Sequence, residues 1–169
     1  MNVNMLEGDH LMRKFLNIGY WIVLLFYSYL LIETVFFARD ARRSVNFIPF
    51  DMIAAQGFTL NVWGNILMFI PLGLYVAHFM KQFKFWSALG IVMGTSFAIE
   101  VFQYVFKRGA TDIDDLLLNA IGGFIGILIH LLFRTLLKSK EHVHMAISTL
   151  SLVVGIPIFL LAIILILSN

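Results

Sequence analysis

The sequence predicts an all-α integral membrane protein: a bundle of five transmembrane helices with a short interfacial or re-entrant segment between helices 1 and 2. Two observations support this fold class. Hydrophobic residues make up 60% of the 169-residue chain and charged residues only 13%, which is more apolar than a soluble core of this size requires. The apolar residues also gather in five runs of about twenty, the length that crosses a bilayer.

The five runs and their connections use nearly the whole chain, so a single membrane domain over residues 1–169 is expected. The stretch before residue 17 is polar and is expected to be a short tail or an interfacial stretch, and residues 138–144 are expected to form a polar connection. The predicted spans cover residues 17–37, 60–79, 85–106, 112–137 and 145–167.

Composition excludes several classes of function. The chain has no cysteine, which excludes disulfides, thiolate metal sites and a cysteine nucleophile. Its formal net charge is +2, and the basic residues lie in ones and twos at the ends of the apolar runs, as membrane-flanking charges do. This distribution argues against nucleic-acid binding. His78 and His130 stand alone, so no histidine metal site is predicted.

One long connection separates the first two spans. Residues 39–59 read RDARRSVNFIPFDMIAAQGFT, and loops longer than about 12–15 residues are usually functional or partly structured. Phe47, Ile48 and Phe50 make this loop too apolar to be fully solvated. We therefore expect the interfacial or re-entrant segment here, folding back over the bundle.

Polar side chains concentrate in residues 100–119, which read EVFQYVFKRGATDIDDLLLN. Near the end of the third span, Ser96, Glu100 and Gln103 follow an i, i+4, i+7 spacing, so they share one helix face. After a short turn, Thr111 or Asp112 is expected to cap the fourth span.

The fourth span has a mixed stripe of its own. Asp115, Asn119, Gly122 and Gly126 follow an i, i+4, i+7, i+11 spacing, so one face begins polar and becomes small. Asp115 lies in the first turn, where an acid interacts favourably with the helix dipole, whereas Asp114 is expected to face solvent. The small residues predict close packing against a neighbouring helix.

Threading five spans brings the polar stretches to one membrane face. The end of the first span with Glu33, the long connection, Asn61 and Asn65, the end of the third span and the start of the fourth must all lie there. Ionisable groups at buried helix ends are costly unless they pair or line a wet cavity. The twelve Lys and Arg residues divide seven to five in favour of the amino-terminal side, which predicts a cytoplasmic amino terminus and an outer polar face.

Four groups of residues between positions 43 and 126 form a recognisable set of motifs. They are Arg43-Ser-Val-Asn-Phe-Ile-Pro-Phe, Asn65-Ile-Leu-Met-Phe-Ile-Pro-Leu-Gly73, the stripe Ser96, Glu100 and Gln103, and the run Arg108, Thr111, Asp112, Asp115, Asn119, Gly122 and Gly126. Single elements such as FIPLG are weak, but in order and spacing the set resembles the VanZ family and is fairly specific. The resemblance implies a small multi-pass protein of the bacterial cytoplasmic membrane, in a family named for teicoplanin resistance, without a settled reaction.

A pocket of carboxylates, arginines and amides at a membrane face suits a lipid or lipid-linked envelope molecule. Arg43 and Arg108 are the candidates for holding a phosphate or carboxylate by bidentate hydrogen bonds. Glu100 is the candidate general acid or base. The neutral donors and acceptors expected around such a ligand are Asn65, Gln103 and Asn119.

Asp112 and Asp115 complete the candidate catalytic set, as partners of Glu100 or as oxygen ligands for a divalent cation. Plainer interpretations stay open: Asp112 is simply a helix cap, and Arg108 forms only a structural ion pair. Three functions therefore remain. The protein is an enzyme acting on an envelope lipid, a non-catalytic binder or transporter of an amphipathic ligand, or an assembly or regulatory subunit.

Overall fold

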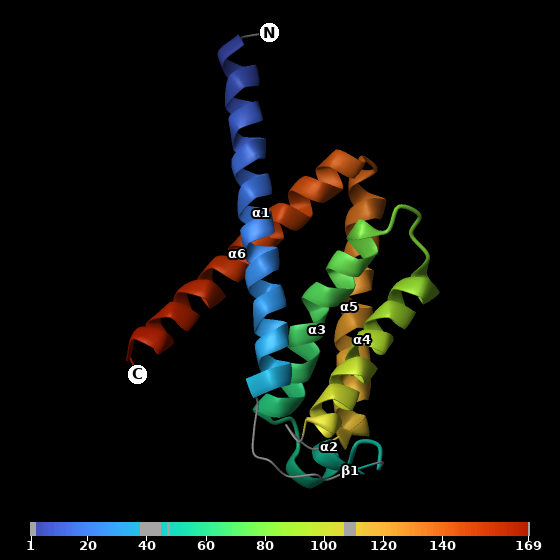
Figure 1. Ribbon diagram of the computed structural model, residues 1–169. Helices are drawn as coiled ribbons and strands as arrows, with labels where there is room; N and C mark the ends of the chain where they lie inside the picture. Colours follow the sequence, from blue (N-terminus) through green and yellow to red (C-terminus); the bar gives the residue numbers. More distant parts are fainter. Residues whose placement is uncertain (1–2, 38–44, 47, 107–110, 169) are drawn as a thin grey trace. The chain divides into compact units, whose positions relative to one another are not determined.

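Figure 1 shows the computed structural model of the protein, which describes residues 3–37, 45–46, 48–106 and 111–168. Five helices in this part of the chain, α1, α3, α4, α5 and α6, are long and apolar enough to cross a membrane. The predicted all-helical membrane fold is thus confirmed. The elements are α1 (Val3–Phe37), β1 (Val45–Asn46), α2 (Asp51–Gln56), α3 (Leu60–Phe79), α4 (Phe85–Val105), β2 (Thr111–Asp112), α5 (Ile113–Leu137) and α6 (Lys140–Ser168).

The bounds of α3, α4 and α5 agree with the predicted spans to within one residue. The two outer helices are longer than predicted. Helix α1 already begins at Val3, so most of the expected tail is helical. Helix α6 begins at Lys140, with only two residues between it and the end of α5 at Leu137. The chain turns there at Lys138, which has a left-handed conformation with φ of 54°. Both stretches were predicted to be connections because they are polar, but Lys, Glu and Arg are good helix formers.

The chain forms two compact units. The first, which we call the α1–α6 unit, comprises Met1–Leu31 and Phe133–Asn169. Its two long helices cross (Figure 1), and Gly19 and Gly155 lie at the crossing against the side chains of Leu152 and Val23. The rings of Phe26 and Phe159 continue this packing edge to face, with centroids 4.8 Å apart.

The second unit, Ile32–Leu132, contains α2 to α4, both strands and most of α5; we call it the α3–α5 unit. Glycines bring its helices close together, as the stripe on the fourth span predicted. A Cβ added at Gly122 would overlap the backbone carbonyl of Ile66 in α3, and one added at Gly126 would overlap that of Ile70. Gly123 faces the side chain of Val92 in α4. Helix α5 therefore packs backbone to backbone on α3.

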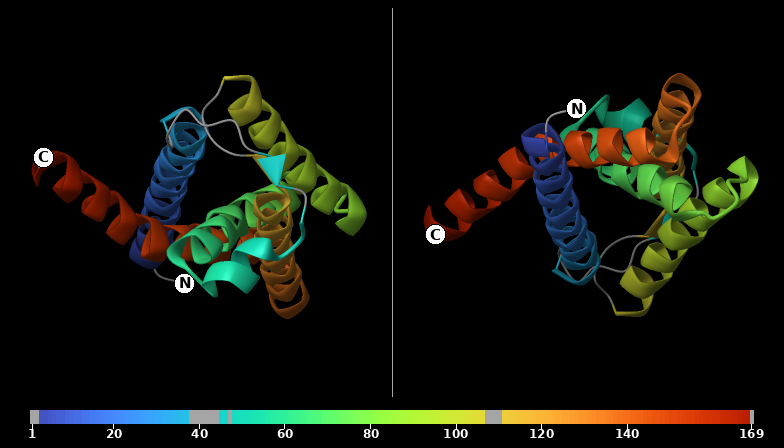
Figure 2. Two further views of the ribbon diagram at one scale, coloured as in Figure 1. Left: turned by 90° about the horizontal axis from the view of Figure 1, so that it is seen from below. Right: turned by 90° about the horizontal axis from the view of Figure 1, so that it is seen from above.

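The long connection is structured where it is described. Strand β1 pairs in parallel with β2, with Val45 opposite Thr111 and Asn46 opposite Asp112. Helix α2 lies beside the first turns of α3 and α5 (Figure 2). The expected segment folding back over the bundle is thus present. The strand pairing was not predicted, because two residues per strand leave no alternation in the sequence.

Candidate functional site

The carboxyl end of α4 is tied to the amino end of α5 through Glu100. This side chain is 5% exposed, and its Oε2 accepts a hydrogen bond from the backbone N–H of Asp112 at 3.3 Å. Asp112 in turn caps α5, since its Oδ1 accepts the N–H of Asp114 at 3.0 Å. The sequence prediction that Glu100 meets the opening acids of the fourth span is confirmed, and so is the cap.

A second link joins α3 to α5. The side-chain amide of Asn65 donates a hydrogen bond to Oδ1 of Asp115. The negative charges of Asp115 and Asp112 both act on the Glu100 carboxyl. Among the described residues, no basic side chain forms an ion pair with Glu100. Three helices therefore contribute to one group of polar side chains with closely spaced carboxylates.

The third link lies one helical turn further along the same faces. Asn119, which is 4% exposed, donates from Nδ2 to the Oγ of fully buried Ser96 at 2.9 Å. Its Oδ1 is buried and has no hydrogen-bond partner among the described residues. Turning the amide over would leave its nitrogen unpartnered at the same place. A buried polar group without a partner costs about 1–3 kcal/mol, so this position favours a ligand or water that supplies the missing bond.

Asp114 was missed by the sequence analysis. It was expected to face solvent, but it is 1% exposed. Its Oδ1 accepts a hydrogen bond from the backbone N–H of Phe50, just before α2. Phe50 has a φ of 62°, a left-handed conformation that a bulky residue rarely adopts. Asp114 thus holds the long connection against α5. One feature of the sequence could have predicted the burial of Asp114: a long apolar connection that folds over the helices needs acceptors for its backbone N–H groups.

The β1–α2 turn beside Asp114 is held by its own hydrogen bonds. Asn46 donates from Nδ2 to Oδ2 of Asp51 at 3.2 Å and accepts the N–H of Ile48 on its Oδ1 at 3.0 Å. Because Asn46 also lies opposite Asp112 in the strand pair, this turn forms a wall next to the start of α5.

The side chains of these three links, together with Asp114, form what we call the polar cluster. It comprises Asn65, Ser96, Glu100, Asp112, Asp114, Asp115 and Asn119. Five of the eight candidate site residues belong to it. Gln103 is half-buried and makes no hydrogen bond with a described residue. Arg43 and Arg108 lie outside the residues that the structure describes.

The polar cluster is rich in hydrogen-bond acceptors. The Glu100 carboxyl and the Asn119 carbonyl each have accepting capacity left, because carboxylate and amide oxygens accept more than one hydrogen bond. The described residues contain no group of three His, Asp or Glu side chains arranged for a metal ion. Chemically, the arrangement suits a ligand that donates hydrogen bonds, such as a hydroxyl, amide or amine group.

Comparisons with known proteins identify the family of this chain. The family model VanZ/LLP1 matches residues 15–134, a range that includes the whole polar cluster. Protein VanZ of Enterococcus faecium is 31% identical over 121 residues, which cover 72% of this chain and 71% of that protein. No solved structure matches the chain significantly. The resemblance stated from the sequence motifs is thereby confirmed, and the chain belongs to the VanZ family.

Proposed function

We propose that the protein acts in the bacterial cytoplasmic membrane, where the polar cluster binds a lipid or lipid-linked envelope molecule. The observation that supports this most directly is the buried oxygen of Asn119, which has no hydrogen-bond partner among the described residues. Asn119 is hydrogen-bonded to Ser96, one helical turn from the buried carboxyl of Glu100. Buried polar groups inside a membrane protein are costly. A ligand that donates hydrogen bonds would offset that cost.

The polar cluster lies near the ends of the helices, which supports binding of a lipid headgroup rather than of an acyl chain. Asn65 lies in the second turn of α3, Glu100 in the last two turns of α4, and Asp115 in the first turn of α5. One to two turns correspond to about 5–11 Å along a helix. A lipid headgroup lies at that depth, near the boundary between hydrocarbon and water.

Apolar side chains near the start of α3 support lipid access. Phe58, Leu60 and Trp63 are 66%, 90% and 49% exposed, and the rings of Phe58 and Trp63 lie 5.9 Å apart. Aromatic residues gather where a membrane protein meets the interface. A lipid could therefore reach the polar cluster from the bilayer, with its chains against this surface.

Two modes of action fit this binding. In the first, Glu100 transfers a proton to or from the headgroup and the protein is an enzyme; in the second, the polar cluster only binds or presents the lipid. Either mode would change the composition or availability of an envelope lipid, which connects the proposal to teicoplanin resistance, the trait implied by the family resemblance. The charge balance around the spans favours an outer-leaflet polar cluster and a cytoplasmic amino terminus.

The test compares cells that carry the intact protein with cells that carry Glu100→Gln. Glutamine keeps an oxygen that accepts the Asp112 N–H, so the variant is expected to fold and insert normally. Mass spectrometry of cellular lipids and of lipids that co-purify with the protein is expected to show loss of the bound species. A changed cellular product would indicate catalysis, and a changed co-purified lipid alone would indicate binding.

Glu33→Gln is the matched control. Glu33 is a half-buried carboxyl on another span and makes no hydrogen bond with a described residue. This variant is expected to retain the profile of the intact protein. If intact protein and Glu100→Gln give the same lipids in both measurements, the proposal is wrong.

A further inference from the structure

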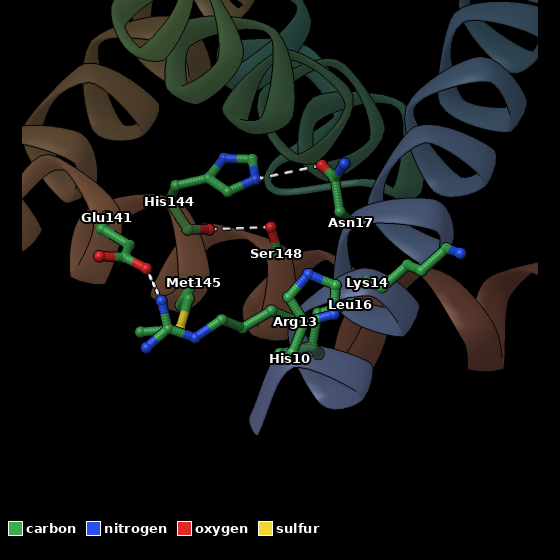
Figure 3. Close-up of a pocket in the computed structure, with 9 residues that line it drawn as sticks. All are labelled: His10, Arg13, Lys14, Leu16, Asn17, Glu141, His144, Met145 and Ser148. Atoms are coloured by element: carbon green, nitrogen blue, oxygen red, sulfur yellow. Dashed lines mark hydrogen bonds and ion pairs between the residues drawn. The ribbon is translucent and has the colours of Figure 1, made fainter. Parts of the chain in front are cut away.

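A second site lies in the α1–α6 unit, apart from the residues of the polar cluster. A pocket of about 430 Å³ opens between the amino-terminal parts of α1 and α6 (Figure 3). This volume falls in the range of pockets that hold small ligands. The pocket is lined by His10, Arg13, Lys14, Leu16, Asn17, Glu141, His144, Met145 and Ser148.

The pocket walls carry a small excess of positive charge. Arg13 and Lys14 come from α1 and Glu141 from α6, so two cations and one anion leave a formal charge of +1 with the histidines neutral. Arg13 forms an ion pair with Glu141, and its guanidinium has five N–H donors, more than one carboxylate uses. The first turn of α6 also lines the pocket, and the amino end of a helix attracts anions.

Hydrogen bonds involve three of the other polar residues that line the pocket. The Oδ1 of Asn17 lies 3.3 Å from Nε2 of His144, and Ser148 donates to the backbone oxygen of His144 at 2.8 Å. In Figure 3 the His144 ring points toward Asn17, while Arg13 reaches toward Glu141. The polar side chains of the inner wall are therefore held by hydrogen bonds, while Arg13 and Glu141, which are 46% and 59% exposed, lie at the rim.

The pocket lies where two candidate membrane spans begin. The candidate spans His10–Glu33 and Lys140–Ile164 both begin beside it. Leu16 and Met145 add apolar surface to the lining. Phosphates of bilayer lipids lie at this depth, and basic pockets between transmembrane helices bind anionic headgroups.

We propose that this pocket binds the phosphodiester of an anionic phospholipid, with Arg13 facing the phosphate and Leu16 and Met145 contacting the glycerol. Lys14 extends away from Arg13 in Figure 3 and adds positive charge at the rim of the pocket. The guanidinium fork of Arg13 suits recognition of a phosphate. The inference involves only residues of the α1–α6 unit and does not depend on the function proposed for the polar cluster.

Native mass spectrometry of the protein in nanodiscs tests whether the pocket binds an anionic phospholipid. The nanodiscs contain phosphatidylcholine alone or phosphatidylcholine with phosphatidylglycerol. We expect the intact protein to retain phosphatidylglycerol selectively. Lys14→Glu changes the formal charge of the pocket from +1 to −1 and leaves the Arg13–Glu141 pair in place. It is expected to bind phosphatidylglycerol about thirtyfold more weakly, since each basic residue near a surface contributes about 1 kcal/mol.

Lys81→Glu is the matched control, because it makes the same change in net charge at an exposed residue that does not line the pocket. It is expected to retain phosphatidylglycerol as the intact protein does. Lys14→Gln, which is milder, is expected to weaken binding about fivefold. If Lys14→Glu and Lys81→Glu retain phosphatidylglycerol equally, or if the intact protein retains phosphatidylcholine as well as phosphatidylglycerol, the proposal is wrong.

A competition arm separates a lipid from a soluble phosphate. Glycerol 1-phosphate added to the nanodiscs is expected to leave the retained phosphatidylglycerol in place, because it lacks the acyl chains that hold a lipid at the membrane boundary. Full displacement at comparable concentration would show that the pocket takes a soluble phosphate, and the lipid assignment would be wrong.

Discussion

At the residue scale, the side chains with the most informative environments are buried polar ones. Glu100 and Asn119 are both at most 5% exposed. Among the described residues each makes one hydrogen bond to a neighbouring segment, Glu100 to the Asp112 backbone and Asn119 to Ser96. A purely structural role would be expected to give the buried Asn119 oxygen a hydrogen-bond partner. Its lack of one among the described residues is what favours a ligand.

Asn119→Leu separates stability from function. Leucine has a similar volume and removes the unpartnered oxygen, and Ser96 can turn its hydroxyl to a backbone carbonyl of its own helix. The melting temperature of the purified protein is therefore expected to stay the same or rise. Retention of the co-purified lipid is expected to be lost. A clear fall in melting temperature, equivalent to a loss of more than about 2 kcal/mol in the free energy of unfolding, would show that the amide is mainly structural.

The Asn65–Asp115 link is also testable by itself. A double-mutant cycle with Asn65→Ala and Asp115→Ala isolates the interaction from the other effects of each change. Hydrogen bonds between transmembrane helices contribute about 0.6–1.7 kcal/mol, and we expect a coupling free energy in this range from reversible unfolding in detergent. Additive effects of the two changes would contradict the hydrogen bond between α3 and α5.

At the scale of elements, close helix packing sets the position of the polar cluster. Helix α5 approaches α3 at Gly122 and Gly126, which lie one to three turns closer to the carboxyl end of α5 than Asn119 and Asp115. The same face therefore holds the helices together and presents the polar side chains. The β1–α2 segment closes the end of this arrangement through Asp114 and the strand pair.

Gly122→Ala tests the packing of α5 on α3. The added Cβ would overlap the Ile66 carbonyl, a backbone atom that cannot turn away, so the helices must separate. Overpacking of this kind costs about 1–3 kcal/mol, and a lower melting temperature is expected. Gly94→Ala is the matched control, since nothing lies within 4 Å of its added Cβ, and it should be neutral or slightly stabilising. Equal melting temperatures for the two variants would contradict the close approach.

Asp114→Ala tests how the long connection is held. The change removes the acceptor of the Phe50 N–H. Phe50 has a φ of 62°, a conformation that is unfavourable for a bulky residue without a stabilising contact. Faster hydrogen exchange is expected across residues 48–57. Asp51→Ala removes an exposed acceptor from the same segment and should have a smaller effect. An unchanged exchange rate in Asp114→Ala would show that the segment is held by other contacts.

At the scale of the whole molecule, the sequence predicted what depends on apolar length and on the order of the spans. Helices α3 to α5 were placed correctly because charged or glycine-containing turns interrupt long apolar runs. The meeting of Glu100, Asp112 and Asp115 followed from threading alone. The parts that were wrong or missed depend on tertiary contacts: the burial of Asp114 needs the β1–α2 segment on top of it, and the helical start of α6 at Lys140 cannot be told from a polar loop by composition.

The most direct test of the polar cluster as a ligand site is an experimental structure of the protein extracted with its native lipids. We predict density for a non-protein headgroup within hydrogen-bond distance of the Asn119 side-chain oxygen, with the Glu100 carboxyl facing the same space. A polar cluster closed by protein side chains, or Glu100 turned toward acyl chains and away from the first turn of α5, would contradict the account.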